Sequence, residues 1–69
     1  MTTIYEIGTM RPTLPNNGDF WIAPNSFVIG NVIMKGATSV WFGTTIRGDN
    51  EIVTINEGTN IQENTILHT

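Results

Sequence analysis

Few side chains of this 69-residue chain could do chemistry, and the only histidine, His68, is the first of them. A neutral imidazole can bind a metal ion or accept a proton, although an isolated surface histidine usually does neither. Arg47 and Asp49 stand two positions apart, and as a surface ion pair they would contribute little to stability. Gln62 and Asn60 carry amides that can orient a small molecule. What these residues can do together depends on the elements that carry them.

Aliphatic residues recur at every sixth position through most of the chain. A first run of five is followed, after one shift of three residues, by three more. This is the spacing of hexapeptide β-helix repeats, in which each short strand forms one side of a coil and points one aliphatic side chain inward. An ordinary β-sandwich of short strands is the alternative. We predict an all-β parallel coil with the inward residues Ile22, Val28, Met34, Val40, Ile46, Ile55, Ile61 and Leu67.

The positions between the aliphatic residues fit the same coil. Four residues after each of them stands a small or β-branched residue, as an inward corner requires, with Asn50 as the one exception. The residues two or three positions after them are mostly glycine, asparagine, aspartate or proline, which form bends. The predicted corner residues are Ser26, Val32, Thr38, Thr44, Thr59 and Thr65.

The same count predicts which outward residues are neighbours. Ile46 and Leu67 are 21 residues apart, which is one coil of 18 residues plus the shift of three, so they should stack in adjacent coils. Arg47 and His68 follow them and should lie about 4.8 Å apart on the outer face, which is one strand spacing. A guanidinium beside the imidazole disfavours its protonation, and so favours the neutral form that binds metals.

The chain divides at about residue 20. Residues 1–20 do not follow the repeat, and we expect them to contain a short strand within residues 4–7 and to cap the first coil. Residues 21–69 hold fewer than three coils and end without a closing segment. Because an open last coil leaves backbone groups unpaired, we expect the chain to be the N-terminal part of a longer protein.

Composition excludes several classes of function. The net charge is -3 with only three basic residues, so no basic stripe exists to bind nucleic acid. The absence of cysteine rules out disulfides and is compatible with a reducing compartment. We expect no secretory leader, because the first residues lack a basic segment followed by an apolar one, and no apolar run is long enough to span a membrane. We therefore expect a cytoplasmic protein with no nucleic-acid or membrane partner.

Three motifs in the second half of the chain resemble the γ-class carbonic anhydrase family. They are R-G-D at 47–49, T-N-I-Q at 59–62 and L-H-T at 67–69, and W-I-A-P at 21–24 and V-I-G-N-V at 28–32 match the opening repeats of that family. The resemblance covers the whole repeat region. It implies a left-handed parallel β-helix, a homotrimer, and a metal ion at each interface between subunits.

The resemblance also implies a role for each polar residue. His68 matches the first of three histidines that hold Zn²⁺, with Fe²⁺ or Co²⁺ as alternatives, and the other two would lie beyond the last residue. Arg47 and Asp49 match a pair at the subunit interface beside the metal. Gln62 matches a residue that orients hydroxide or bicarbonate. Asn60 matches one that supports it, although an asparagine at that corner is equally expected as a turn former.

One departure from the family concerns proton transfer. In the best-studied members of the family an acidic residue near the R-x-D segment carries protons to bulk water, and many relatives lack it. Here Asp49 is followed by Asn50, which cannot titrate, and Glu51 is the next acid.

The leading hypothesis is therefore reversible hydration of CO2 to bicarbonate by hydroxide held at a metal. With only one of the three ligands, the 69-residue chain alone is expected to be inactive. Two alternatives stay open, namely a hexapeptide-repeat acyltransferase that uses acyl-CoA and a non-catalytic scaffold member of the same family. The R-G-D and T-N-I-Q motifs disfavour the acyltransferase, but the fold alone does not decide among the three.

Overall fold

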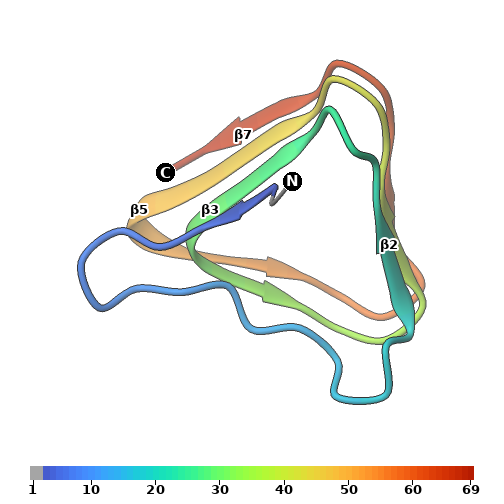
Figure 1. The fold of residues 1–69 in the computed structure, drawn as a ribbon, viewed down its shortest axis with the longest axis horizontal. Helices are drawn as coiled ribbons and strands as arrows, with labels where there is room; N and C mark the ends of the chain where they lie inside the picture. Colours follow the sequence, from blue (N-terminus) through green and yellow to red (C-terminus); the bar gives the residue numbers. More distant parts are fainter. Residues whose placement is uncertain (1–2) are drawn as a thin grey trace.

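The computed structural model describes residues 3–69, and all the regular structure in that part of the chain is β-strand. Viewed down its axis, the chain winds round a triangle (Figure 1). The two longest strands each turn a corner and so serve two sides of the triangle. The strands are β1 (Ile4–Tyr5), β2 (Phe20–Ile22), β3 (Phe27–Met34), β4 (Thr38–Val40), β5 (Thr45–Ile55), β6 (Asn60–Ile61) and β7 (Ile66–His68).

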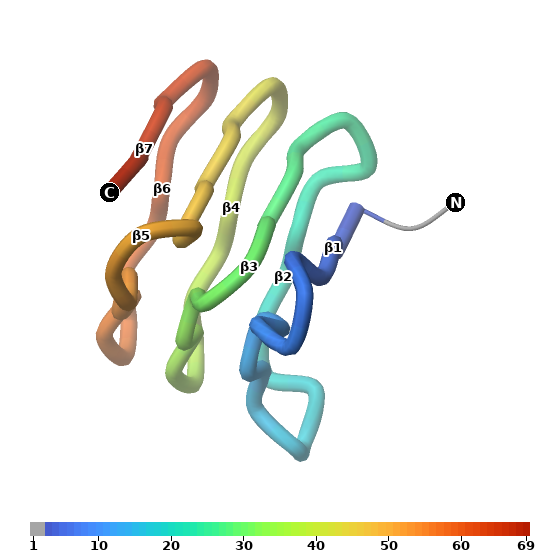
Figure 2. Tube along the Cα trace, turned by 90° about the vertical axis from the view of Figure 1, so that its left-hand side faces the viewer, coloured from blue at the N-terminus to red at the C-terminus, as the bar shows by residue number. Residues whose placement is uncertain are grey.

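Neighbouring strands are parallel and come from successive coils. One sheet has the order β1-β3-β5-β7 and the other the order β2-β4-β6. Val28 pairs with Ile46, and Ile46 pairs with Leu67, as the six-residue count predicts. In Figure 1 the chain runs counter-clockwise while the coils recede from the viewer, and Figure 2 shows the same coils stacked from the N-terminus to the C-terminus. The molecule is therefore a left-handed parallel β-helix, and the predicted fold is confirmed.

The aliphatic residues of the repeat form the core. Five of them are at most 4% exposed: Val28, Met34, Val40, Ile46 and Ile55. Ile22 in the first coil, and Ile61 and Leu67 in the last, are half-buried and pack against this core. Full burial of such a side chain stabilises a fold by about 1.5–3 kcal/mol. The stack of aliphatic residues is thus the main source of stability.

Small hydroxyl residues occupy three buried corners, namely Ser26, Thr38 and Thr44. The Ser26 hydroxyl donates a hydrogen bond of 2.7 Å to the carbonyl of Ala23 within the same bend. The Thr44 hydroxyl donates one of 2.7 Å to the carbonyl of Gln62 in the next coil. A buried carbonyl without a partner is costly, so these hydroxyls explain why the corners favour serine and threonine.

Residues 3–20 lie against the first coil. Ile4 pairs with Val28, so β1 adds one strand to the edge of β3. This strand is shorter than the predicted segment 4–7, because Ile7 forms an isolated antiparallel bridge with Met10 instead. Leu14 and other residues of this segment pack against the core. A capping role for residues 1–20 stays a prediction, and residues 1 and 2 lie outside the described part.

The shift of three residues in the repeat is a bulge in β5. Gly30 pairs with Gly48 and Val32 pairs with Val53, so residues 49–52 lie opposite Asn31 alone. The sequence predicts the bulge in this place. Bulges change the direction of the side chains next to them. This bulge starts at Asp49, the last residue of the R-G-D motif.

Candidate functional site

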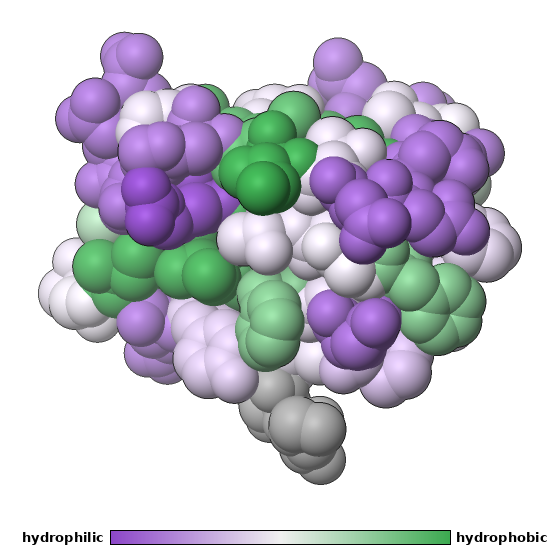
Figure 3. Space-filling view, turned by 90° about the horizontal axis from the view of Figure 1, so that it is seen from above, coloured by the Kyte–Doolittle hydropathy of each residue, from purple (hydrophilic) through white to green (hydrophobic). Residues whose placement is uncertain are grey.

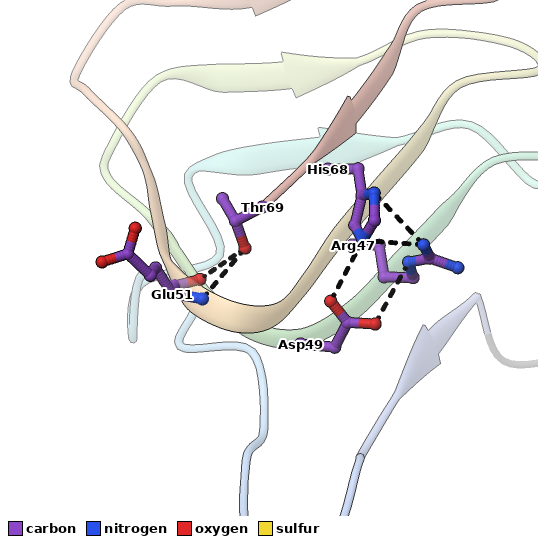
Figure 4. A network of polar contacts seen from close by, with 5 residues as sticks. All are labelled: Arg47, Asp49, Glu51, His68 and Thr69. Atoms are coloured by element: carbon purple, nitrogen blue, oxygen red, sulfur yellow. Dashed lines mark hydrogen bonds and ion pairs between the residues drawn. The ribbon is translucent and has the colours of Figure 1, made fainter.

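His68 ends β7 and points outward beside Arg47 of β5. The two residues are register partners, as the sequence predicts. The Arg47 Nη2 atom lies 2.7 Å from His68 Nε2 and 3.2 Å from His68 Nδ1. Figure 4 shows the guanidinium beside the imidazole ring. Because a guanidinium can only donate, the contact at 2.7 Å is a hydrogen bond only in the tautomer whose Nε2 atom carries no proton.

Asp49 joins these two residues in what we term the polar cluster, Arg47–Asp49–His68. Its Oδ2 atom lies 3.2 Å from Arg47 Nε, and its Oδ1 atom lies 3.3 Å from His68 Nε2. The second contact would need a proton on Nε2, so the contacts with Arg47 and with Asp49 correspond to different protonation states of the ring. The three side chains are 46%, 33% and 47% exposed. At such exposure the cluster contributes little to stability, and its effect is to fix geometry.

Gly48 has a steric reason to stand between Arg47 and Asp49. A β-carbon at Gly48 would lie 2.5 Å from the carbonyl oxygen of Asn31 in the adjacent coil. No real β-carbon approaches a carbonyl so closely. The glycine of the R-G-D motif therefore lets two coils meet where the bulge begins.

Thr69 connects the bulge to β7. Its hydroxyl accepts a hydrogen bond of 3.0 Å from the Glu51 N–H and donates one of 2.9 Å to the Glu51 carbonyl (Figure 4). We identify Thr69 from the sequence only as part of the L-H-T motif, although Thr69 and Glu51 are 18 residues apart, the length of one coil without the shift of three. This residue of the site was therefore missed by reasoning from the sequence.

Asn60 and Gln62 lie on a different side of the triangular coil from His68, because β6 and β7 belong to different sheets. Asn60 is part of β6 and not of a turn, so its interpretation as a turn former is wrong. Its side-chain oxygen accepts a hydrogen bond of 2.6 Å from Ser39, which in turn accepts one of 2.8 Å from the Trp41 indole. The Gln62 side chain is exposed, as predicted. Within residues 3–69, neither amide is hydrogen-bonded to His68, so one chain does not bring all the predicted site residues together.

One chain also does not complete a metal site. Residues 3–69 contain no group of three histidine, cysteine, aspartate or glutamate side chains that could hold a metal ion. His68 fits as a single ligand, because its imidazole is about half exposed and points outward from the coil. Zinc normally takes four ligands. A complete site would need donors from outside this chain.

The outer face of β1, β3, β5 and β7 carries exposed apolar side chains next to the polar cluster. Phe27, Thr45 and Ile66 form one row across β3, β5 and β7, with Phe27 37% and Ile66 74% exposed. The ring of Tyr5 lies 5.9 Å from that of Phe27. Figure 3 shows hydrophobic side chains between strongly hydrophilic ones on this side of the molecule. We call the exposed side chains Tyr5, Phe27 and Ile66 the apolar row; such exposed groups often mark a contact surface.

The comparison with known proteins identifies similar sequences but no matching family model. Gamma carbonic anhydrase 2, mitochondrial, of Arabidopsis thaliana is 42% identical over 50 residues, which are 72% of this chain and 18% of the relative. Gamma carbonic anhydrase 1, mitochondrial, of the same plant is 42% identical over 48 residues, or 70% of this chain and 18% of the relative. A carbonic anhydrase of Geobacillus kaustophilus is 44% identical over 48 residues, or 70% of this chain and 26% of the relative. The chain thus spans between 18% and 26% of the length of these relatives.

Residues 3–69 include no helix with the length and apolar character that crossing a membrane requires.

Proposed function

Because the chain is γ carbonic anhydrase-like in sequence, we propose that the protein takes part in the reversible hydration of CO2 to bicarbonate. The observation that carries this proposal is the polar cluster. Arg47, Asp49 and His68, which the motifs single out, meet on the outer face of adjacent coils. The alignments cover a minor part of each relative, so the activity is proposed for the protein as its gene encodes it.

His68 would act as one metal ligand through Nε2. Zinc, or iron or cobalt in its place, would lower the pKa of a water molecule so that hydroxide forms near neutral pH, and hydroxide is the nucleophile that CO2 hydration requires. For Nε2 to face a metal, the Arg47 guanidinium must move from its contact at 2.7 Å. The Asp49 carboxylate, which lies 3.3 Å from Nε2, must move from the ring as well, and it can stay paired with Arg47 through Nε. The polar cluster would therefore hold the imidazole in a fixed orientation until a metal binds.

Gln62 would orient the reacting water or bicarbonate through its amide, with Asn60 in support. Both amides lie one side round the coil from His68, so they would meet a histidine only from another copy of the chain. A homotrimer, which the family resemblance implies, would bring such sides together. The apolar row next to the polar cluster supports this proposal, because burying Phe27 and Ile66 between copies would favour association.

Proton release is the step for which this chain is least equipped. Asn50 cannot titrate, while Glu51 is exposed and its backbone is held by Thr69. We expect hydration to be limited by proton transfer to buffer, so that raising the buffer concentration increases the rate.

We also propose that the protein is located in the cytoplasm. The cytoplasm is a reducing compartment, and the absence of cysteine is compatible with it. The Arabidopsis relatives carry "mitochondrial" in their names. Cell fractionation with an antibody against the protein distinguishes the two locations.

Stopped-flow measurement of CO2 hydration tests the proposal on the protein as its gene encodes it. Gln62→Ala should keep its metal and lose about 10- to 100-fold in rate, as is typical for residues that support a metal site. Glu63→Ala, at the exposed residue that follows Gln62, is the matched control and should keep the wild-type rate. A Gln62→Ala protein as fast as the wild type would contradict the role of the amide. Acyl-CoA transfer in place of hydration would favour the acyltransferase alternative.

A further inference from the structure

The bulge in β5 leaves part of the candidate site without support from the sheet. Residues 49–52 have no register partners in β3. On the other side, the pairing of β5 with β7 ends at Arg47 and His68. Asp49, which contacts His68, therefore lies in a segment that the ladder does not fix. Another interaction must hold this segment if Asp49 is to keep its position.

The hydroxyl of Thr69 provides such an interaction. It accepts a hydrogen bond of 3.0 Å from the Glu51 N–H and donates one of 2.9 Å to the Glu51 carbonyl. In a parallel sheet, the N–H and C=O of one residue point to the same neighbouring strand. A single side-chain hydroxyl thus takes the place of a partner strand for Glu51. Figure 4 shows this pair beside the polar cluster on the same bend of the chain.

We propose that Thr69 is a positioning residue for His68. By fixing Glu51 it keeps Asp49 at 3.3 Å from His68 Nε2 and at 3.2 Å from Arg47 Nε. Thr69 directly follows His68, so adjacent residues of the chain hold the bulge and present the imidazole. The functional meaning of this role rests on the proposed function of His68 as a metal ligand, but the positioning itself does not.

Amide exchange and ring ¹⁵N signals, both measured by NMR without metal, test the positioning. Thr69→Val keeps the shape of the side chain and removes both hydrogen bonds, whereas Thr69→Ser keeps them. We expect the Glu51 amide to exchange about tenfold faster in Thr69→Val, in line with the loss of such bonds. The His68 ring signals should change in the same variant. Thr69→Ser, and Thr54→Val as a control at an exposed threonine of β5, should behave as wild type.

A second variant keeps the test decisive if Thr69→Val does not fold. Asp49→Asn should change the His68 ring signals but leave Glu51 exchange as it is, because Thr69 still holds Glu51. Unchanged Glu51 exchange in Thr69→Val would overturn the proposal. Faster Glu51 exchange in Asp49→Asn would also overturn it, because the bulge would then depend on the polar cluster and not on Thr69.

Zinc titration of the protein as its gene encodes it separates the two proposals. We expect zinc affinity to fall about tenfold in Thr69→Val, the lower end of the effect of supporting residues, and to return in Thr69→Ser. A wild-type protein that does not bind zinc would refute the role of His68 and leave the exchange result standing. Equal zinc affinity in wild type and Thr69→Val would refute the positioning of a metal ligand by Thr69.

Discussion

Replacing Val40 by aspartate should unfold the chain. Val40 is fully buried in β4, the middle strand of the sheet β2-β4-β6. Its register partners are Ile22 in the coil before and Ile61 in the coil after. The side chains of the core cluster to which Val40 belongs are all apolar, and none of them can donate a hydrogen bond to a carboxylate.

The magnitude follows from two losses. Val40 contributes about 1.5–3 kcal/mol through burial, which an aspartate forfeits. A buried carboxyl group without a partner costs several kcal/mol more, whether it stays charged or takes up a proton. A chain of this length has a total stability of about 3–10 kcal/mol, at roughly 0.05–0.15 kcal/mol per residue. The substitution should therefore remove most or all of it.

Circular dichroism during thermal unfolding measures the effect. Val40→Ala should stay folded with a lower melting temperature, because it removes two methyl groups at about 0.8 kcal/mol each and leaves a small cavity. Thr54→Asp, at an exposed position of β5, should change stability by less than about 0.5 kcal/mol. A soluble, folded Val40→Asp protein with an unchanged melting temperature would show that Val40 does not point into the coil, and would refute the repeat count.

Two further substitutions test the packing and hydrogen bonding around the site. Gly48→Ala should destabilise the chain by about 1–3 kcal/mol, because the added carbon would meet the Asn31 carbonyl at 2.5 Å, and urea unfolding that gives the wild-type free energy would contradict this. Asn60→Ala should cost about 0.5–1.5 kcal/mol by taking away the acceptor of the Ser39 hydroxyl. It should also change the emission of Trp41, whose indole donates to Ser39, so an unaltered spectrum would argue against that chain of hydrogen bonds.

The sequence predicted the coil well because its repeat is regular. One inward aliphatic residue in every six positions predicts both the core and the stacking of coils. The shift of three residues placed Ile46 under Leu67, and the contact between Arg47 and His68 followed directly. Periodicity determines on which side of a strand a side chain lies, so the outward direction of Gln62 was also predictable.

Features that depend on individual contacts were not predictable from the sequence. Ala37 adopts the left-handed conformation, with a φ of 56°, although Gly36 next to it is the residue that adopts it most easily. Asn60 is held in β6 by its bond to Ser39, so its preference for turns does not decide its conformation. The bond of Thr69 to Glu51 spans 18 residues at a bulge, where a partner can be counted with or without the shift of three, so the repeat alone does not select it.

The zinc content of purified protein tests the central claim, that His68 is a metal ligand, most directly. We expect the protein as its gene encodes it to bind zinc, and His68→Ala to retain little, because removing one imidazole weakens a site built from three. Gln62→Ala should keep the wild-type content. The 69-residue chain by itself should bind zinc no better than a peptide with one exposed histidine, since residues 3–69 hold no group of three ligands. Full zinc occupancy in the His68→Ala protein would contradict the assignment of His68 as a ligand.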